Sequence, residues 1–231
     1  MPIYTNKPNI QEMFDSLADS YDKMNTILSL GMHNIWNSRF VQMLGRANHL
    51  IDLCAGTGKV VATYIKKYPG VSATLVDFSK NMLNLAKQRY PCATMNFIES
   101  DIACMPFEDN SYDLASMAYG LRNLPNPENA LREIHRVLTT TGRLGILELT
   151  SPSQRHPIYL AHKMYLKAFV PWIGKVITKN HEAYAYLSNS IRCLPKDQEL
   201  ESIFQHSGFL TERKQKLFWG AATIWILKKF P

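Results

Sequence analysis

The sequence predicts an α/β fold built on a doubly wound, mostly parallel sheet. From about residue 49 to residue 149, short aliphatic runs alternate with longer runs of helical periodicity. Pro69-Gly70, Pro91 and Gly142 interrupt this alternation, as proline and glycine do between regular elements. The chain has 231 residues, 46% of them hydrophobic and 19% charged, so one sizeable core is expected. Such alternation indicates parallel strands with helices on both faces of the sheet.

Five strands and three helices are expected inside this alternating region. The expected strands are "HLIDLCA", "ATLVDF", "TMNFIES", "YDLASMA" and "RLGILEL". The expected helices are "KVVATYIKKY", "SKNMLNLAKQRY" and "NPENALREIHRVL". Ser79 has the side chain of an N-cap for the second helix, and Pro127 suits the first turn of the third. Gly142 is expected in a turn that leads into the fifth strand.

The two ends of the chain differ from this alternating region. Residues 1–45 are expected to form a helical cap, and residues 151–195 a helical lid insertion. After them, "DQELESIFQHSGF" predicts a helix that ends near Gly208. Two β-rich runs joined around Trp219-Gly220 then predict a closing hairpin with an antiparallel last strand. We therefore expect a single domain with a seven-stranded sheet.

The composition favours some functional classes over others. The four cysteines are scattered, so we expect no metal site and no disulfide framework, and a reducing, cytoplasmic location. We expect no signal peptide and no membrane-spanning segment, and at most peripheral contact with the inner face of a membrane. The net charge is +7, and five basic residues but no acidic one lie between Glu148 and Glu182. They stand among bulky aliphatic residues and no RNA-binding motif is present, which argues against nucleic acid.

The turn in "IDLCAGTGKVV" indicates a nucleotide-like ligand, and three patterns compete for it. A phosphate-binding loop needs glycine five residues before Gly58 and Ser or Thr after the lysine, but Leu53 and Val60 occupy these positions. A dinucleotide fingerprint needs a third glycine where Val61 stands. What remains is a small-residue turn, with Gly56 and Gly58, between acidic residues at successive strand ends.

Three acidic residues would follow or end the first three strands. Asp52 ends the first strand, Asp77 is placed to bind a ribose diol, and Asp101 can accept from an adenine amino group. No arginine lies near to meet a 2′-phosphate. A ligand with adenine, ribose and a cationic amino-acid tail fits this set, and S-adenosylmethionine has these parts. Thr57 either contacts its methionine moiety or caps the following helix.

Longer motifs resemble the ubiquinone/menaquinone biosynthesis C-methyltransferase family, and the likeness is closer to its menaquinone branch. They are "YDKMNTILSLGMHNIWNSRFV", "DLCAGTG", "MPFEDNSYDLASMAYGLRNL", "ALREIHRVL" with "GRLGILEL", and "AYAYLSNSIRCLP". The resemblance spans about residues 13 to 226. It implies a class I, Rossmann-like methyltransferase fold with S-adenosylmethionine contacts at Thr57, Asp77, Asp101 and Ile102. The chain departs from the family pattern at Cys54-Ala55, where Ala-Gly is usual, and at Ala118, where serine is frequent.

The resemblance implies methyl transfer to a ring carbon of a demethylmenaquinol. Arg122 and Asn123 follow the fourth strand, at the edge where such sheets bind ligands. Arginine stays protonated, so Arg122 would stabilise the developing phenolate or orient a water molecule rather than act as the base. Their alternative role is a hydrogen-bonded pair that stabilises the loop. Tyr119 and Tyr21 are candidates for substrate binding, whereas His33 is better explained as a satisfied or surface histidine.

A polyprenylated quinol would bring the protein to the bilayer, at least transiently. The segment "YLAHKMYLKAFVPWIGKVITK" mixes lysines with large apolar residues, as a lid with membrane contact would, and Pro171 breaks any single long helix there. Three other functions stay open: the matching benzoquinol methyltransferase, a methyltransferase for a small phenol, a sterol or RNA, and an inactive cofactor-binding scaffold. The sequence also leaves homo-oligomerisation open.

Overall fold

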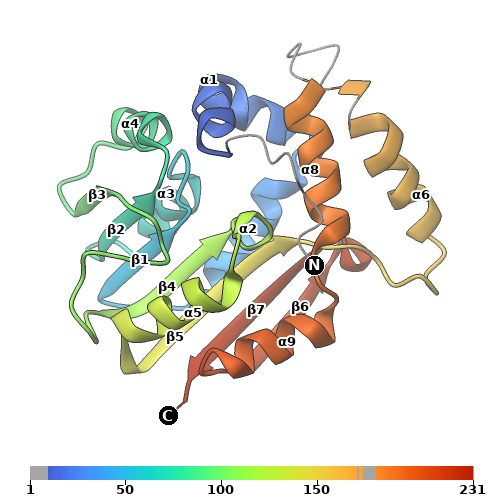
Figure 1. The fold of residues 1–231 in the computed structure, drawn as a ribbon. Helices are drawn as coiled ribbons and strands as arrows, with labels where there is room; N and C mark the ends of the chain where they lie inside the picture. The colour runs from blue at the N-terminus through green and yellow to red at the C-terminus, as the bar shows by residue number, and fades with distance from the viewer. Residues whose placement is uncertain (1–9, 171, 174–180, 231) are drawn as a thin grey trace.

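A computed structural model describes residues 10–170, 172–173 and 181–230. The expected helix break at Pro171 lies outside these residues. A seven-stranded sheet with the strand order β3-β2-β1-β4-β5-β7-β6 forms the centre of the molecule (Figure 1). Only β7 runs antiparallel to its neighbours, and the other adjacent pairs are parallel. The predicted fold class is thus confirmed, including the antiparallel last strand.

The strands and helices follow the expected order. The strands are β1 (His49–Leu53), β2 (Ser72–Asp77), β3 (Met95–Glu99), β4 (Tyr112–Ala118), β5 (Leu138–Leu149), β6 (Phe209–Leu217) and β7 (Ala222–Lys229). The α-helices are α1 (Ile10–Leu28), α2 (Met32–Leu44), α3 (Lys59–Lys67), α4 (Lys80–Arg89), α5 (Pro127–Val137), α6 (Tyr159–Met164), α8 (His181–Cys193) and α9 (Asp197–His206). A π-helical stretch, Tyr165–Phe169, follows α6, and 3-10 turns span Leu121–Asn123 and Phe218–Gly220.

Two hydrophobic cores fill the two faces of the sheet. Helices α2, α3 and α4 pack on one face, where Phe40, Val61 and Ala86 are fully buried. Helices α5 and α9 cover the other face with Leu131 and Phe204. Because both faces are covered, the central strands are apolar almost throughout, as is typical of parallel sheets. These cores hold the strand ends that form the site in a fixed arrangement.

Local sequence signals set most of the helix boundaries. The Ser79 hydroxyl accepts from the backbone N–H of Met82 and begins α4, as predicted. Asn126 caps α5 in the same way, with Pro127 in the first turn. The expected turn at Gly142 is present but lies inside β5, which begins at Leu138: a Cβ at Gly142 would lie 2.9 Å from the Thr139 carbonyl oxygen, so the chain folds back tightly between these residues. The strand passes this point with an irregularity in its pairing with β4, so the chain bends without leaving the sheet.

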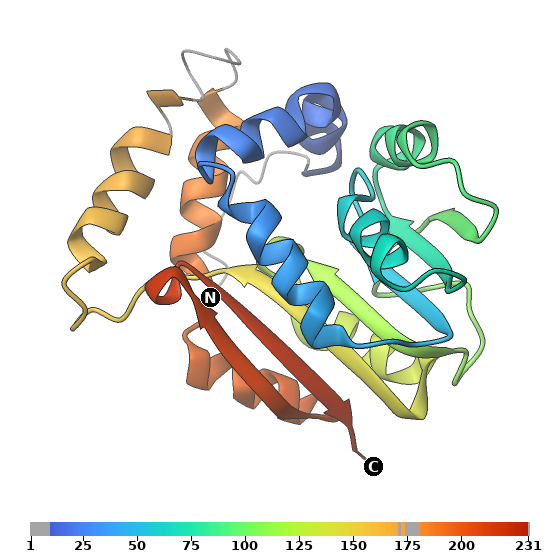
Figure 2. The ribbon, with the colours of Figure 1, turned by 180° about the vertical axis from the view of Figure 1, so that it is seen from behind.

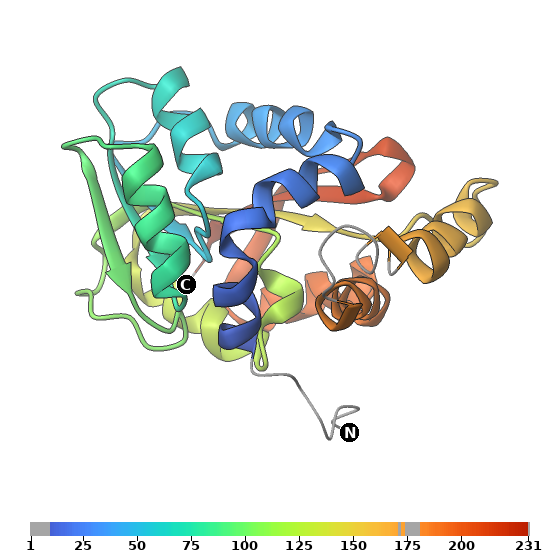
Figure 3. The same ribbon diagram turned by 90° about the horizontal axis from the view of Figure 1, so that it is seen from above.

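Helices α1, α8 and α6 lie beyond the carboxyl ends of the parallel strands (Figures 1 and 2). Helix α1 is joined to the end of β2, where Gln11 donates to the carbonyl of Phe78 over 2.9 Å. Seen from above, α6 stands at the outer edge of the molecule, beyond α8 (Figure 3). Within the described residues, no helix is both long enough and apolar enough to cross a membrane.

Candidate active site

Two cavities lie between the carboxyl edge of the sheet and the helices above it. The first, here called the acidic cavity, has a volume of 640 Å³ and lies at the ends of β2 and β3. The second, the apolar cavity, measures 330 Å³ and lies between the α1–α2 turn, α6, α8 and the β6–β7 turn. Tyr21 and Tyr119 line both. The two cavities therefore adjoin at these two rings.

The lining of the acidic cavity suits a cationic nucleoside without phosphate. Three carboxylates line it, those of Asp77, Glu99 and Asp101, and no described lining residue is basic. A phosphate would lack a positive partner here, whereas a positively charged ligand would have three negative ones. Phe78 and Ile102 add apolar surface on which a flat base can lie. The residues present thus fit S-adenosylmethionine.

Asp77 has the geometry expected of a ribose-binding carboxylate. Its Oδ2 accepts from the backbone N–H of Gly56 over 2.8 Å, and its Oδ1 from that of Ser79 over 2.9 Å. Each oxygen keeps a further lone pair for a ligand hydroxyl. Burial raises the pKa of Asp77 to about 6, against the lowering effect of these two hydrogen bonds. Its ionisation therefore falls within the range of ordinary assays.

The remaining residues of the glycine turn lie behind the wall of the acidic cavity. Asp52 is buried and accepts from the Ser116 hydroxyl over 2.5 Å, and burial raises its pKa to about 7. Gly58, with φ +76°, begins α3, and a Cβ there would lie 3.0 Å from that of Ala86. None of Asp52, Gly56, Thr57 and Gly58 lines the cavity. Their contribution to cofactor binding stays a prediction.

Thr57 makes a contact that the sequence does not reveal. Its hydroxyl lies 3.0 and 3.1 Å from the two carboxylate oxygens of Asp22 on α1, so it is not the cap of α3. Asp22 also forms an ion pair of 2.5 Å with Arg89 of α4. Two turns earlier on α1, Asp15 accepts from the Ser79 hydroxyl over 2.5 Å. Helix α1 is thus fastened across the acidic cavity at several points.

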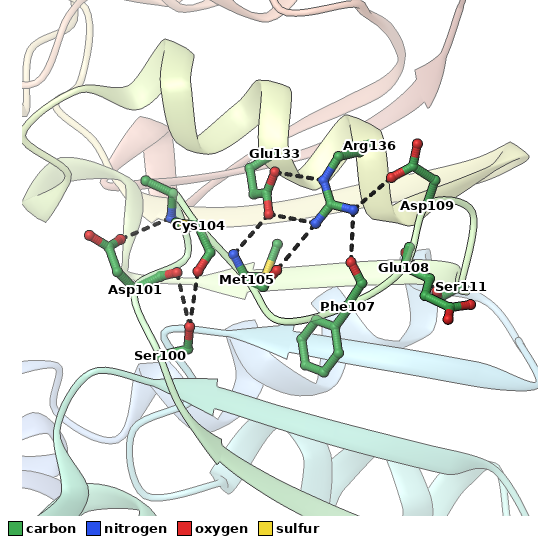
Figure 4. A network of polar contacts seen from close by, with 11 residues as sticks. Ser100, Asp101, Cys104, Met105, Phe107, Glu108, Asp109, Ser111, Glu133 and Arg136 are labelled. Atoms are coloured by element: carbon green, nitrogen blue, oxygen red, sulfur yellow. Dashed lines mark hydrogen bonds and ion pairs between the residues drawn. The ribbon is translucent and has the colours of Figure 1, made fainter.

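The loop between β3 and β4 carries Asp101 and Ile102 to the acidic cavity. A clamp made by Glu133 and Arg136 of α5 holds this loop (Figure 4). Arg136 donates to the carbonyls of Met105 and Phe107, over 3.2 and 2.7 Å. Glu133 accepts from the backbone N–H of Met105 over 2.8 Å and is itself paired with Arg136. The polar groups of an irregular loop are thereby satisfied from one helix face.

Arg122 and Asn123 face different cavities. Arg122 lines the apolar cavity, whereas Asn123 lines the acidic one. The Asn123 side chain donates to the Tyr119 carbonyl over 3.3 Å and accepts from the Tyr186 hydroxyl over 3.1 Å. The geometry thus places Asn123 in a hydrogen-bonded support and leaves Arg122 as the charged group of the apolar cavity.

A buried carboxylate, missed in the sequence, fixes Arg122. Glu148, at the end of β5, accepts from Arg122 Nη1 over 2.7 Å and from its backbone N–H over 3.1 Å. The side chains of this pair are 0% and 5% exposed. Burial lowers the pKa of Arg122 but Glu148 raises it, and the net direction is upward. Arg122 Nε is buried without a partner in the described structure, while the residue itself lines the apolar cavity.

Tyr21 and Tyr119 form the boundary between the two cavities. The Tyr119 backbone has φ +60°, a conformation that non-glycine residues rarely adopt, and its hydroxyl donates to Asn37 of α2 over 2.9 Å. Its carbonyl also accepts from Arg122 Nη1. Burial raises the pKa of Tyr21 and of Tyr119, so both rings carry neutral hydroxyls at neutral pH. Backbone strain at a cavity wall is typical of functional positions.

His33, another polar residue of the apolar cavity, is already paired. His33 Nδ1 lies 2.8 Å from the Ser29 hydroxyl, and its Nε2 lies 2.8 Å from Lys59 Nζ. Burial, and then the charge of Lys59, lower the pKa of His33, so the ring is neutral. The expectation of a satisfied histidine is confirmed. Within the described lining no carboxylate occurs, so Arg122 is the charged anchor of an otherwise apolar space.

Comparisons with known proteins agree with this geometry. The ubiE/COQ5 methyltransferase family matches residues 3–229. A protein of Chlamydia felis named demethylmenaquinone methyltransferase is 59% identical over 229 residues, which are 99% of this chain and 100% of the relative.

Solved structures also resemble the fold. An S-adenosylmethionine-dependent methyltransferase of Aquifex aeolicus superposes with a TM-score of 0.62 at 14% identity, covering 84% of this chain and 89% of the other. A second such methyltransferase, from Thermotoga maritima, gives 0.67 at 17% identity, covering 96% and 99%. At these identities the likeness supports the fold alone.

Proposed function

The chain belongs to the ubiE/COQ5 methyltransferase family and is an S-adenosylmethionine-dependent methyltransferase, and we propose that it methylates a ring carbon of a demethylmenaquinol. The observation that carries this proposal is the junction of the two cavities. An acidic cavity for the cofactor and an apolar cavity for a flat, hydrophobic acceptor adjoin at Tyr21 and Tyr119. The acceptor named for the Chlamydia felis relative has this character.

The cofactor would lie in the acidic cavity and supply an electrophilic methyl group. Asp77 would accept from the ribose hydroxyls, and Asp101 from the adenine amino group, beside Ile102. Asn123 lines the same cavity and supports the Tyr119 backbone. Asp52, Gly56, Thr57 and Gly58 would act from behind the wall, by shaping the turn that offers the Gly56 N–H to Asp77.

Arg122 would make the acceptor carbon nucleophilic. A hydroquinone has electron-rich ring carbons, whereas the oxidised quinone has not, so the reduced form is the substrate. The Arg122 guanidinium, which lines the apolar cavity, would hold the ring oxygen as it becomes phenolate, and this pushes electron density onto the neighbouring carbon. That carbon would form the new bond to the methyl group as the bond between the methyl group and the sulfonium sulfur breaks and leaves a thioether. The proton on the same ring carbon would then pass to water, which restores the aromatic ring. Tyr21 and Tyr119 would hold the ring in line with the acidic cavity and exclude water.

The isoprenoid tail would leave the apolar cavity on the side of α6. We propose that the protein meets the cytoplasmic face of the membrane transiently to collect this substrate. The basic, aromatic segment that includes α6 supports this proposal, because anionic headgroups attract lysines and the interface accepts large apolar side chains.

The test is methyl transfer from labelled S-adenosylmethionine to demethylmenaquinol and to the matching benzoquinol, both kept reduced in detergent. We expect turnover with the naphthoquinol and a loss of about 10²–10³ in kcat for Arg122→Ala. Arg132→Ala, in an exposed pair with Glu128 on α5, is the matched control and should behave as wild type. Turnover of the benzoquinol alone would assign the other branch of the family. Cofactor binding without turnover of either quinol would contradict the proposal.

A further inference from the structure

Exposed apolar side chains gather around the mouth of the apolar cavity. Leu30 and Phe218 line this cavity although they are 84% and 49% exposed. Leu160, Met164 and Trp219 are more than half exposed, and Trp219 contacts the His156 ring next to α6 at 6.4 Å. We call this set the apolar rim: Leu30, Leu160, Met164, Phe218 and Trp219. It unites three segments that are far apart in the sequence, and an exposed apolar patch beside a cavity indicates an interaction surface.

Helix α6 has the form of an interfacial element. None of its residues is buried, so it has no core of its own to hold it in water. Ala161 and His162 line the apolar cavity, whereas Leu160, Lys163 and Met164 do not line it and are exposed to solvent. In Figure 3 the helix stands apart from the sheet and its covering helices. Two apolar side chains beside a lysine, on a helix without buried residues, are typical of a helix that lies in a membrane surface.

The π-helical stretch that follows the C-terminus of α6 is nevertheless anchored to the rest of the molecule. Tyr165 donates to the carbonyl of Leu28 at the end of α1, and the Ser188 hydroxyl of α8 donates to the carbonyl of Leu166 over 2.5 Å. Leu166 itself is 3% exposed. The exposed part of α6 is therefore held at a defined position beside the cavity mouth.

The two turns of the rim present apolar side chains on unusual backbone. Leu30, Phe218 and Trp219 have φ values of +50°, +44° and +55°, where glycine or asparagine is usual. The strained turns are held by hydrogen bonds such as that from Thr150 Oγ1 to the Gly220 carbonyl, 2.8 Å long. A solvent-facing turn gains nothing from large apolar residues in this conformation, whereas one that enters a lipid interface does.

The charge around the rim identifies the occupant. Arg155, Lys163 and Lys167 are exposed on the α6 side, and the sequence has no acidic residue between Glu148 and Glu182. The described lining of the apolar cavity has no carboxylate either. Large apolar side chains beside a segment with basic and no acidic residues match an anionic bilayer, with its acyl chains behind negative headgroups.

We infer that the apolar rim docks on an anionic phospholipid bilayer, so that the mouth of the apolar cavity opens directly into the lipid. A long-tailed acceptor then moves from the membrane into the cavity while its tail stays among acyl chains. The inference rests on the proposed function for the identity of that acceptor, but lipid binding can be measured without any quinol.

The experiment measures binding of the full chain to vesicles of phosphatidylcholine alone and mixed with phosphatidylglycerol. We expect wild type to favour the anionic vesicles, and Met164→Ser/Trp219→Ser to lower the partition coefficient about tenfold or more. Leu210→Ser is the control: Leu210 is 37% exposed near the opposite end of β6 from Trp219, about 20 Å or more away, and should bind as wild type.

Charge reversal separates the electrostatic part. Lys163→Glu/Lys167→Glu should weaken binding to anionic vesicles about tenfold or more, while Lys66→Glu/Lys67→Glu, with the same charge change at the exposed end of α3, should have a small effect.

All variants should turn over a tail-less quinol like wild type, and the rim variants should lose activity on the tailed quinol in vesicles. Failure of the proposed function would appear as absent turnover with lipid binding intact. Wild-type binding by the rim variants, or no preference for anionic lipid, would overturn the docking surface.

Discussion

The acidic cavity and the apolar cavity share two tyrosines but are built in different ways. The acidic cavity is formed by strand ends whose polar groups are fixed by hydrogen bonds, as those of Asp77 are by Gly56 and Ser79. The apolar cavity is formed by side chains from the α1–α2 turn, α6, α8 and the β6–β7 turn, with one buried ion pair at its inner end. The first cavity is a property of the sheet, whereas the second depends on segments added around it.

The difference has a consequence for specificity. A polar ligand in the acidic cavity meets positions that the parallel sheet sets, and the same fold occurs in other S-adenosylmethionine-dependent methyltransferases. The acceptor meets a cavity whose walls can change without disturbing the sheet. The added segments then decide which acceptor a protein with this common fold uses. A substitution in the acidic cavity should affect cofactor binding, and one in the apolar cavity should affect methyl transfer to the acceptor.

Apart from loss of Arg122 itself, the largest effect is expected from Glu148→Gln, which acts on the acceptor side alone. The amide of the new glutamine would place its NH₂ group against the backbone N–H of Arg122 or of Leu149, so that two donors would face each other. In addition, the buried Arg122 would lose its negatively charged partner. We expect kcat to fall by about 10² or more, with cofactor affinity within about twofold of wild type. Labelled methyl transfer and calorimetric cofactor binding measure the two quantities.

A double variant tests whether Glu148 acts through Arg122. Because the two side chains form one unit, Arg122→Ala/Glu148→Gln should be about as active as Arg122→Ala. Additive losses would mean that Glu148 has a separate role, and weak cofactor binding with normal turnover would contradict the division between the cavities.

Asp77→Asn should produce the next largest effect, on the acidic side. The asparagine NH₂ group would oppose one of the two N–H groups that the carboxylate accepts, so we expect the cofactor dissociation constant to rise about 10- to 100-fold. Turnover at saturating cofactor should change much less. An unchanged dissociation constant would remove Asp77 from the cofactor site.

The same carboxylate predicts a pH dependence of cofactor binding. Burial raises the pKa of Asp77 to about 6, with Asp15 adding to the shift, and raises that of the neighbouring Asp52 to about 7. Since a raised acid pKa favours the protonated folded protein, this contribution to stability is present below pH 4 and is lost as pH rises through 6. Cofactor binding needs the carboxylate and should weaken as pH falls below about 6 in wild type. In Asp77→Asn this part of the pH dependence should disappear from binding titrations.

The acidic cavity could be predicted from the sequence more fully than the apolar one. Asp77 and Asp101 were predicted, because a residue at a strand end is readable from local periodicity and parallel strands end at one edge. Glu148 was missed because it ends an apolar strand and its partner lies 26 residues earlier. Leu30 and Phe218 were missed because nothing local relates two turns at opposite ends of the chain. An apolar cavity leaves no motif, since any large apolar residue can line it.

The smallest effect is expected from the clamp on the loop between β3 and β4 (Figure 4). Arg136→Gln removes donors to the Met105 and Phe107 carbonyls, and the loop that carries Asp101 and Ile102 becomes less well ordered. We expect cofactor affinity to fall about three- to tenfold, with a modest loss of thermal stability and little change in kcat at saturating cofactor.

Arg132→Gln is the matched control for this clamp, because it lies one turn earlier on α5 and has only a 3.4 Å exposed pair with Glu128. Arg132→Gln should leave both the cofactor affinity and the thermal stability unchanged. If Arg136→Gln lowers the melting temperature while cofactor affinity stays at the wild-type value, the clamp serves the fold only. If the KM for the quinol rises as much as that for the cofactor, the loop influences both cavities. Their separation at Tyr21 and Tyr119 would then be weaker than the geometry indicates.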